Sequence, residues 1–81
     1  NRRALLEATD HEFRRFLRSG HRATFMMIDI DRFKQLNDAR GHAAGDEALR
    51  AIAAVLKSSL RDTDTCGRMG GDEFGVVLAD A

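Results

Sequence analysis

The chain carries its clearest signal in Arg68-Met69-Gly70-Gly71-Asp72-Glu73-Phe74, where two adjacent carboxylates directly follow a pair of glycines. A glycine pair between two strand-like segments predicts a two-residue β-hairpin, because primed turns require positive φ angles. At an effective dielectric of about 20, like charges about 4 Å apart repel by roughly 4 kcal/mol. We therefore expect a compensating cation here, such as a divalent metal that carries a phosphate substrate.

The segments on either side of this turn have the composition of strands, and a third apolar run lies earlier in the chain. The predicted strands are Thr65–Met69, Glu73–Ala79 and Thr24–Ile28. The last of these does not alternate, which is typical of a strand buried on both faces. Asp29 would then lie at its C-terminal end, where open α/β sheets present ligand-binding groups.

Helical periodicity marks the remaining segments. Leu6, Phe13 and Leu17 recur on one face near the N-terminus, and the leucines of the central segment do the same. The predicted helices are Asn1–Arg18, Asp31–Ala39 and Asp46–Leu60, with a glycine-bracketed loop at Arg40–Gly45. The element order is helix, strand, helix, helix, strand, strand, which indicates an α/β (α+β) fold.

Composition limits the classes of function. The chain has 81 residues, enough for one small domain, and 13 basic residues balance 13 acidic ones. Zero net charge argues against a broad nucleic-acid footprint. Cys66 is the only cysteine, so no intrachain disulfide can form, which fits a reducing compartment. The longest apolar run, Ala51–Leu56, is far shorter than the roughly 20 residues that a membrane span needs.

Two further polar clusters precede the hairpin. Asp29 and the backbone carbonyl of Ile30 could ligate a hard cation; alternatively, Asp31 caps the following helix and Asp29 is only solvated. Phe33 and Lys34 occupy positions that exclude an EF-hand loop.

In the second cluster, Gly41-His42-Ala43-Ala44-Gly45-Asp46, the glycines would let a ligand approach the backbone, and Asp46 could accept a hydrogen bond from a base edge or a sugar. The alternative is a C-cap glycine followed by Asp46 as the N-cap of the next helix. His42, Cys66 and Asp46 do not form a recognisable zinc site.

Taken together, the three clusters resemble the GGDEF family of bacterial diguanylate cyclase domains. The resemblance is carried by Gly70-Gly71-Asp72-Glu73-Phe74 and by the upstream pattern Phe25-x-x-Ile28-Asp29-Ile30-Asp31-x-Phe33-Lys34-x-x-Asn37-Asp38-x-x-Gly41-His42-x-x-Gly45-Asp46-x-x-Leu49. Asn1-Arg2-Arg3 resembles the tail of the family's N-terminal element. The resemblance implies that residues 1–81 form a partial domain that lacks its first residues and its C-terminal part. The implied fold is a palm-like sheet, as in class III nucleotide cyclases, with flanking helices and truncation after the hairpin.

The resemblance also implies an activity. Such domains condense two GTP molecules into cyclic di-GMP and pyrophosphate, with two Mg²⁺ (or Mn²⁺) ions per active site, across a head-to-tail homodimer. The implied location is the bacterial cytoplasm, or the cytoplasmic part of a membrane-bound sensor. No nucleic-acid partner is expected.

Roles for individual residues follow from the same resemblance. Asp29, the carbonyl of Ile30, Asp72 and Glu73 are implied as metal ligands, and Asp72 also as the general base for the 3′-hydroxyl. Lys34 would offset charge on the triphosphate in the transition state. The implied substrate-binding residues are Phe33, Lys34, Asn37, His42, Asp46, Gly70 and Gly71, with Asn37 and Asp46 reading guanine.

Arg61 and Asp64 fit the Arg-x-x-Asp pattern of the family's inhibitory product site, with five residues between Asp64 and Gly70. A guanidinium can stack on guanine and form paired hydrogen bonds to phosphate. The alternative is a basic residue at a helix C-terminus followed by an acidic turn.

Two other functions are weighed against the cyclase. A non-catalytic receptor for GTP or cyclic di-GMP would not need the carboxylate pair Asp72 and Glu73. A palm-like nucleotidyltransferase acting on nucleic acid fits poorly with zero net charge. We expect the isolated chain to be poorly stable and at best weakly active, because a sheet edge would be left open.

Overall fold

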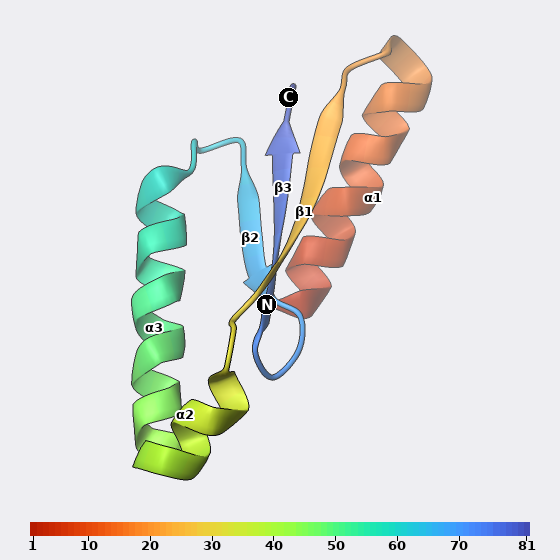
Figure 1. The fold of residues 1–81 in the computed structure, drawn as a ribbon. Coiled ribbons are helices and arrows are strands. Elements are labelled where there is room, and N and C mark those ends of the chain that lie inside the picture. Colours follow the sequence, from red (N-terminus) through yellow and green to blue (C-terminus); the bar gives the residue numbers. More distant parts are fainter.

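The computed structural model describes all 81 residues, which form three helices and three strands in one elongated body of 49 × 20 × 18 Å (Figure 1). The elements are α1 (Arg2–Ser19), β1 (Ala23–Asp29), α2 (Phe33–Arg40), α3 (His42–Ser59), β2 (Thr65–Arg68) and β3 (Glu73–Ala79). The order predicted from the sequence is confirmed. No helix is both long and apolar enough to span a membrane.

The sheet is antiparallel throughout, with the strand order β1-β3-β2. The last strand of the chain is therefore the central one, and β3 is the best-buried element, with Phe74, Val76, Val77 and Ala79 in the core. Pairing of β1 with β3 runs from Ala23 opposite Ala79 to Asp29 opposite Glu73. The end of β1 consequently lies beside the start of β3.

The strand predicted at Thr24–Ile28 is present, but the expectation that it is buried on both faces was wrong. Phe25, Met26 and Met27 are 43%, 40% and 51% exposed. The reason is its position: β1 is an edge strand that pairs only with β3, so the continuous apolar run is not enclosed in this chain.

The predicted two-residue hairpin was also wrong. Strand β2 ends at Arg68 and β3 begins at Glu73, so residues 69–72 form the connection. Neither Gly70 nor Gly71 has a positive φ. The turn closes differently: the carbonyl oxygen of Glu73 accepts from the N–H groups of Met69 (2.8 Å) and Gly70 (3.4 Å).

A third correction concerns the predicted loop Arg40–Gly45. Helix α3 begins at His42, not at Asp46, and Gly41 alone makes the corner between α2 and α3. Its φ of 86° and ψ of 165° suit glycine, and its N–H donates to the carbonyl oxygen of Asn37 at 2.7 Å. The expectation that a glycine caps the C-terminus of α2 is thus confirmed, whereas Asp46 lies inside α3 and is not its N-cap.

Helix α1 packs on the sheet through its N-terminal half. Leu5 is fully buried and lies directly over Gly75 of β3, where an added Cβ would overlap Leu5 Cδ2. Gly75 pairs with Gly67 of β2, and a Cβ on Gly67 would come within 2.7 Å of the carbonyl oxygen of Asn1. This glycine pair therefore lets the start of α1 approach the sheet backbone. Much of the predicted apolar stripe of α1 is exposed, with Phe13 at 59% and Leu17 at 68%.

Candidate functional site

The residues predicted to bind metal come together at one end of the sheet. Asp29 is the last residue of β1 and lies opposite Glu73, the first residue of β3. The N–H of Ile30 donates to the carbonyl oxygen of Asp72 at 3.0 Å, which holds the loop after β1 against the loop before β3. Antiparallel pairing thus joins two segments that lie far apart in the sequence (Figure 1).

The carboxylates at this end have no cationic partner within the chain. Asp72 and Glu73 are half-buried and Asp29 is exposed, and none of the three forms an ion pair or a side-chain hydrogen bond. The carboxylate of Glu73 lies against Gly70, since a Cβ there would come within 2.9 Å of Glu73 Oε1. No group of three or more His, Cys, Asp or Glu side chains is close enough together to hold a metal ion by itself.

The connection between β1 and α2 contains a strained residue. Arg32 directly precedes α2 with a φ of 58° and a ψ of 29°, a left-handed conformation that costs a non-glycine residue about 1–2 kcal/mol. The N-terminus of α2 has no side-chain cap, so the alternative role of Asp31 as a helix cap is not observed. Phe33 and the exposed Lys34 belong to the first turn of α2, which follows Asp29 closely in the sequence. Helix α2 lies beyond the end of the sheet at which β1 ends (Figure 1).

Helices α2 and α3 meet closely at Gly45. This residue is buried, and a Cβ there would overlap Asn37 Oδ1 and come within 3.2 Å of Phe33 Cζ. Asn37 and Asp46, the two predicted guanine readers, are therefore brought near each other, because Asp46 directly follows Gly45. Asn37 Oδ1 is buried without a hydrogen-bond partner, and Asp46 is exposed. His42 is the exposed first residue of α3.

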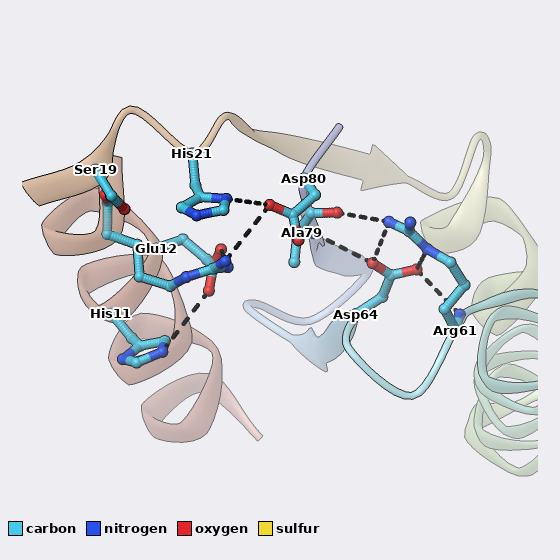
Figure 2. Close-up of polar contacts among 9 residues, drawn as sticks. His11, Glu12, Ser19, His21, Arg61, Asp64, Ala79 and Asp80 are labelled. Carbon is cyan, nitrogen blue, oxygen red and sulfur yellow. Dashed lines mark hydrogen bonds and ion pairs between the residues drawn. The ribbon is translucent and has the colours of Figure 1, made fainter. Parts of the chain in front are cut away.

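The predicted inhibitory pair lies at the opposite end of β3 and is fully formed (Figure 2). Arg61 donates to Asp64 through Nε (3.1 Å to Oδ2) and through a terminal nitrogen (2.9 Å to Oδ1). The same terminal nitrogen donates to the carbonyl oxygen of Ala79 at 2.7 Å, and the N–H of Ala79 donates to Asp64 Oδ1 at 3.2 Å. The pair therefore ties the connection between α3 and β2 to the end of β3.

These contacts determine the ionisation of the pair. Hydrogen bonding from Arg61 is the main cause that holds the pKa of Asp64 below its usual value, although burial opposes it. Hydrogen bonding to Asp64 in turn raises the pKa of Arg61. The Asp64 side chain is only 3% exposed, while that of Arg61 is 58% exposed. A guanidinium fixed at one edge by a carboxylate thus keeps much of its surface in solvent.

A second polar network, which the sequence did not reveal, links α1 to the end of β3 (Figure 2). Asp80 accepts from His21 Nδ1 (2.9 Å) and from Arg15 (3.5 Å), and Arg15 also pairs with the buried Glu12 at 2.7 Å. Hydrogen bonding from His21 is the main cause that holds the pKa of Asp80 below its usual value.

The fold is a small α+β arrangement of three helices and a three-stranded antiparallel sheet, and comparisons with known proteins identify its family. The family described as “Diguanylate cyclase, GGDEF domain” matches residues 1–81. The chain is 38% identical over 81 residues to the probable diguanylate cyclase DgcJ of Escherichia coli strain K12, which covers 100% of this chain and 16% of that protein.

Solved structures give the same assignment. The diguanylate cyclase SiaD of Pseudomonas aeruginosa, crystallised with its activator SiaC, is 46% identical with a TM-score of 0.95, covering 100% of this chain and 31% of SiaD. The GGDEF domain of DgcB from Caulobacter crescentus, solved with c-di-GMP, is 30% identical with a TM-score of 0.95. The match covers 100% of this chain and 47% of the DgcB chain. The chain belongs to the GGDEF family, and it spans less than half the length of each of these proteins.

The contact at Gly45 leads to a testable prediction about the packing of α2 against α3. Gly45→Ala is expected to destabilise the domain by about 1–3 kcal/mol, because the new methyl group overlaps the Asn37 amide in a closely packed interface. Urea denaturation measures this change. In the double variant Asn37→Ala/Gly45→Ala the amide is absent, so the cost should be less than the sum of the two single changes. Strict additivity would contradict the contact.

Proposed function

We propose that this chain is the N-terminal part of a diguanylate cyclase catalytic domain, which forms cyclic di-GMP from two molecules of GTP with release of pyrophosphate. The observation that carries the proposal is the junction of β1 with the loop before β3. There, the Asp29–Glu73 pairing and the hydrogen bond from Ile30 to Asp72 bring the family's acidic positions to one end of the sheet. In the reaction, the 3′-hydroxyl oxygen of each GTP bonds to the α-phosphorus of the other.

The types of donor at this junction suit Mg²⁺ or Mn²⁺, although the carboxylates are not close enough together in this structure to hold an ion by themselves. Carboxylate and carbonyl oxygens are the ligands that these hard cations prefer, and the side chains of Asp29, Asp72 and Glu73 have no protein cation as a partner. Asp29, the carbonyl of Ile30, Asp72 and Glu73 would hold the metals. When bound, such ions would activate the attacking oxygen and stabilise the leaving pyrophosphate.

Residues of α2 would bind the phosphates. The N–H groups at the first turn of a helix carry a partial positive charge and have no partners within the helix. Phe33 would offer such an N–H to the triphosphate, and the exposed Lys34 would add a full positive charge. Asp72 would accept the proton of the 3′-hydroxyl.

The seam between α2 and α3 supports guanine as the base. Asn37 Oδ1 is buried and unsatisfied, a state that costs about 1–3 kcal/mol and that a donor on a ligand could relieve. The carboxylate of Asp46 can accept from the N1–H and N2–H₂ groups of guanine. His42, at the start of α3, would contact the substrate from the same side.

The Arg61–Asp64 pair would bind cyclic di-GMP as an inhibitor. It lies at the end of β3 opposite the acidic junction, about 20 Å away along a strand of this length. Product bound there could not occupy the metal site of the same domain. Inhibition would therefore act through the arrangement of two domains, since the proposed homodimer would place two GTP molecules face to face.

Replacing the proposed base gives the principal test. Asp72→Asn in the full-length protein is expected to lower turnover of labelled GTP by about 100-fold or more, because the amide can neither accept the proton nor ligate metal in the same way. Separation of the products with Mg²⁺ present measures cyclic di-GMP directly. Asp10→Asn, the same change on the exposed face of α1, serves as the matched control.

The outcomes of this experiment separate the candidate functions. Full activity of Asp72→Asn would refute the role of the carboxylate. If the unmodified protein binds GTP or cyclic di-GMP tightly but forms no product, the receptor function replaces the cyclase.

Gly71→Ala tests whether a nucleotide passes close to the loop. No atom lies within 4 Å of an added Cβ and φ is not left-handed, so stability should change by less than about 0.5 kcal/mol. A ligand packed against Gly71 would instead clash with the methyl group, and GTP affinity should fall about tenfold or more. Thermal unfolding and GTP titration measure the two effects. Unchanged affinity would mean that Gly71 is not needed for substrate binding.

Arg61→Ala tests the inhibitory site. The concentration of cyclic di-GMP that halves activity should rise about tenfold or more, while the initial rate without product stays within about twofold. Because hydrogen bonding from Arg61 holds the pKa of Asp64 below its usual value, this carboxylate stays ionised throughout the neutral pH range of the assay. Arg61→Lys keeps the charge but not the paired donors, so intermediate inhibition is expected. Inhibition that is unchanged in both variants would rule out this site.

A further inference from the structure

Arg68 makes an unusual set of contacts for an exposed arginine. It is the last residue of β2, and its Nε donates to the carbonyl oxygen of Gly70 at 3.0 Å. A terminal nitrogen donates to the carbonyl oxygen of Gly71 at 2.6 Å. One guanidinium therefore holds two successive peptide groups of the connection between β2 and β3. No other side chain forms a hydrogen bond with this loop.

These contacts complete a clamp on the loop from both flanking strands. The carbonyl oxygen of Asp72 is held from the other side by the N–H of Ile30, just after β1. Because β1 and β2 flank β3, the carbonyl groups of residues 70, 71 and 72 are each fixed by a neighbouring strand or its extension. Glycines at positions 70 and 71 have no side chains to do this, and neither adopts a turn with positive φ.

The clamp also orients the donors of the loop. All peptide bonds are trans, so each N–H points away from the carbonyl of its own peptide group. When Arg68 holds the carbonyls of Gly70 and Gly71, the N–H groups of Gly71 and Asp72 face the opposite side. Neither of these N–H groups has an acceptor within the chain. They remain available to a ligand on the side away from Arg68.

Arg68 does not pair with the carboxylates of the neighbouring loop. It forms no ion pair with Asp72 or Glu73, although both are close in sequence. Its charge is directed to backbone oxygens, and the carboxylates stay free for another cation. An arginine that formed ion pairs with Asp72 and Glu73 would neutralise these carboxylates and so weaken the proposed metal site.

We propose that Arg68 is a positioning residue for the reaction: it fixes the Gly70–Asp72 backbone so that Asp72 and Glu73 face the substrate in one conformation. This inference rests on the proposed cyclase function. Arg68 itself does not touch the reacting atoms. Its loss should therefore lower kcat and loosen the loop, with little effect on the binding of GTP.

The test compares Arg68→Gln and Arg68→Lys in the full-length protein. Arg68 is exposed, so neither variant should prevent folding. Arg50→Gln is the matched control, because Arg50 and Arg68 line one pocket between α3 and β2 and Arg50 forms no side-chain hydrogen bond. Steady-state kinetics with GTP and Mg²⁺ give kcat and KM. Hydrogen exchange of the peptide covering residues 68–74 reports on the loop without requiring activity.

Arg68→Gln is expected to lower kcat about tenfold, with KM for GTP within about twofold, and to speed exchange of the Met69 and Gly70 amides. Arg68→Lys should give an intermediate kcat, because an ammonium group lacks the planar pair of donors. Arg50→Gln should match the unmodified protein in every measurement.

Three results would overturn the proposal. In the first, both kcat and loop exchange of Arg68→Gln are normal. In the second, the loop loosens but kcat is unchanged. In the third, KM rises with kcat unchanged, which makes Arg68 a substrate contact. If the unmodified protein makes no cyclic di-GMP, the proposed function fails separately, and the exchange difference alone decides whether Arg68 holds the loop.

Discussion

The antiparallel pairing of β1 with β3 is the interaction on which the rest of this structure depends. It places Asp29 opposite Glu73 and lets the N–H of Ile30 bond to Asp72, so that acidic groups from distant parts of the chain meet at one end of the sheet. Register matters because the side-chain period of a strand is two: a slip of one residue would send Asp29 to the other face. Burial of Val76 and Val77 on the two faces of β3 opposes such a slip.

Strand β3 also separates the two proposed functional regions. Its first residue belongs to the acidic junction, and its last, Ala79, is held by Arg61 and Asp64. This central strand is hydrogen-bonded to a neighbour on each side, and most of its residues are buried. The network of Glu12, Arg15 and Asp80 ties α1 to the C-terminal end of β3.

Much of this organisation could be predicted from the sequence, and each error has a physical cause in the tertiary structure. Periodicity and glycine placement predicted the order of the elements and the type of each. The loop predicted at Arg40–Gly45 failed because Gly45 serves a close helix contact with Asn37, not a turn. The two-residue hairpin failed because Glu73 and Arg68 close the loop by hydrogen bonds. The strand at Thr24–Ile28 is exposed instead of buried on both faces because it lies at the edge of the sheet. Each of these features depends on neighbours that the local sequence does not reveal.

The sequence by itself determined the family, the acidic motif and the chemical character of each candidate ligand, because these depend on residue type and spacing alone. The tertiary structure decided which of these residues lie close to one another. Only strand pairing joins Asp29 to Glu73, only helix packing leaves Asn37 Oδ1 without a partner, and only the fold of the loop turns Arg68 toward two carbonyl groups instead of an acid. Contacts between residues far apart along the chain depend on how the elements pack, which no local pattern of residues encodes.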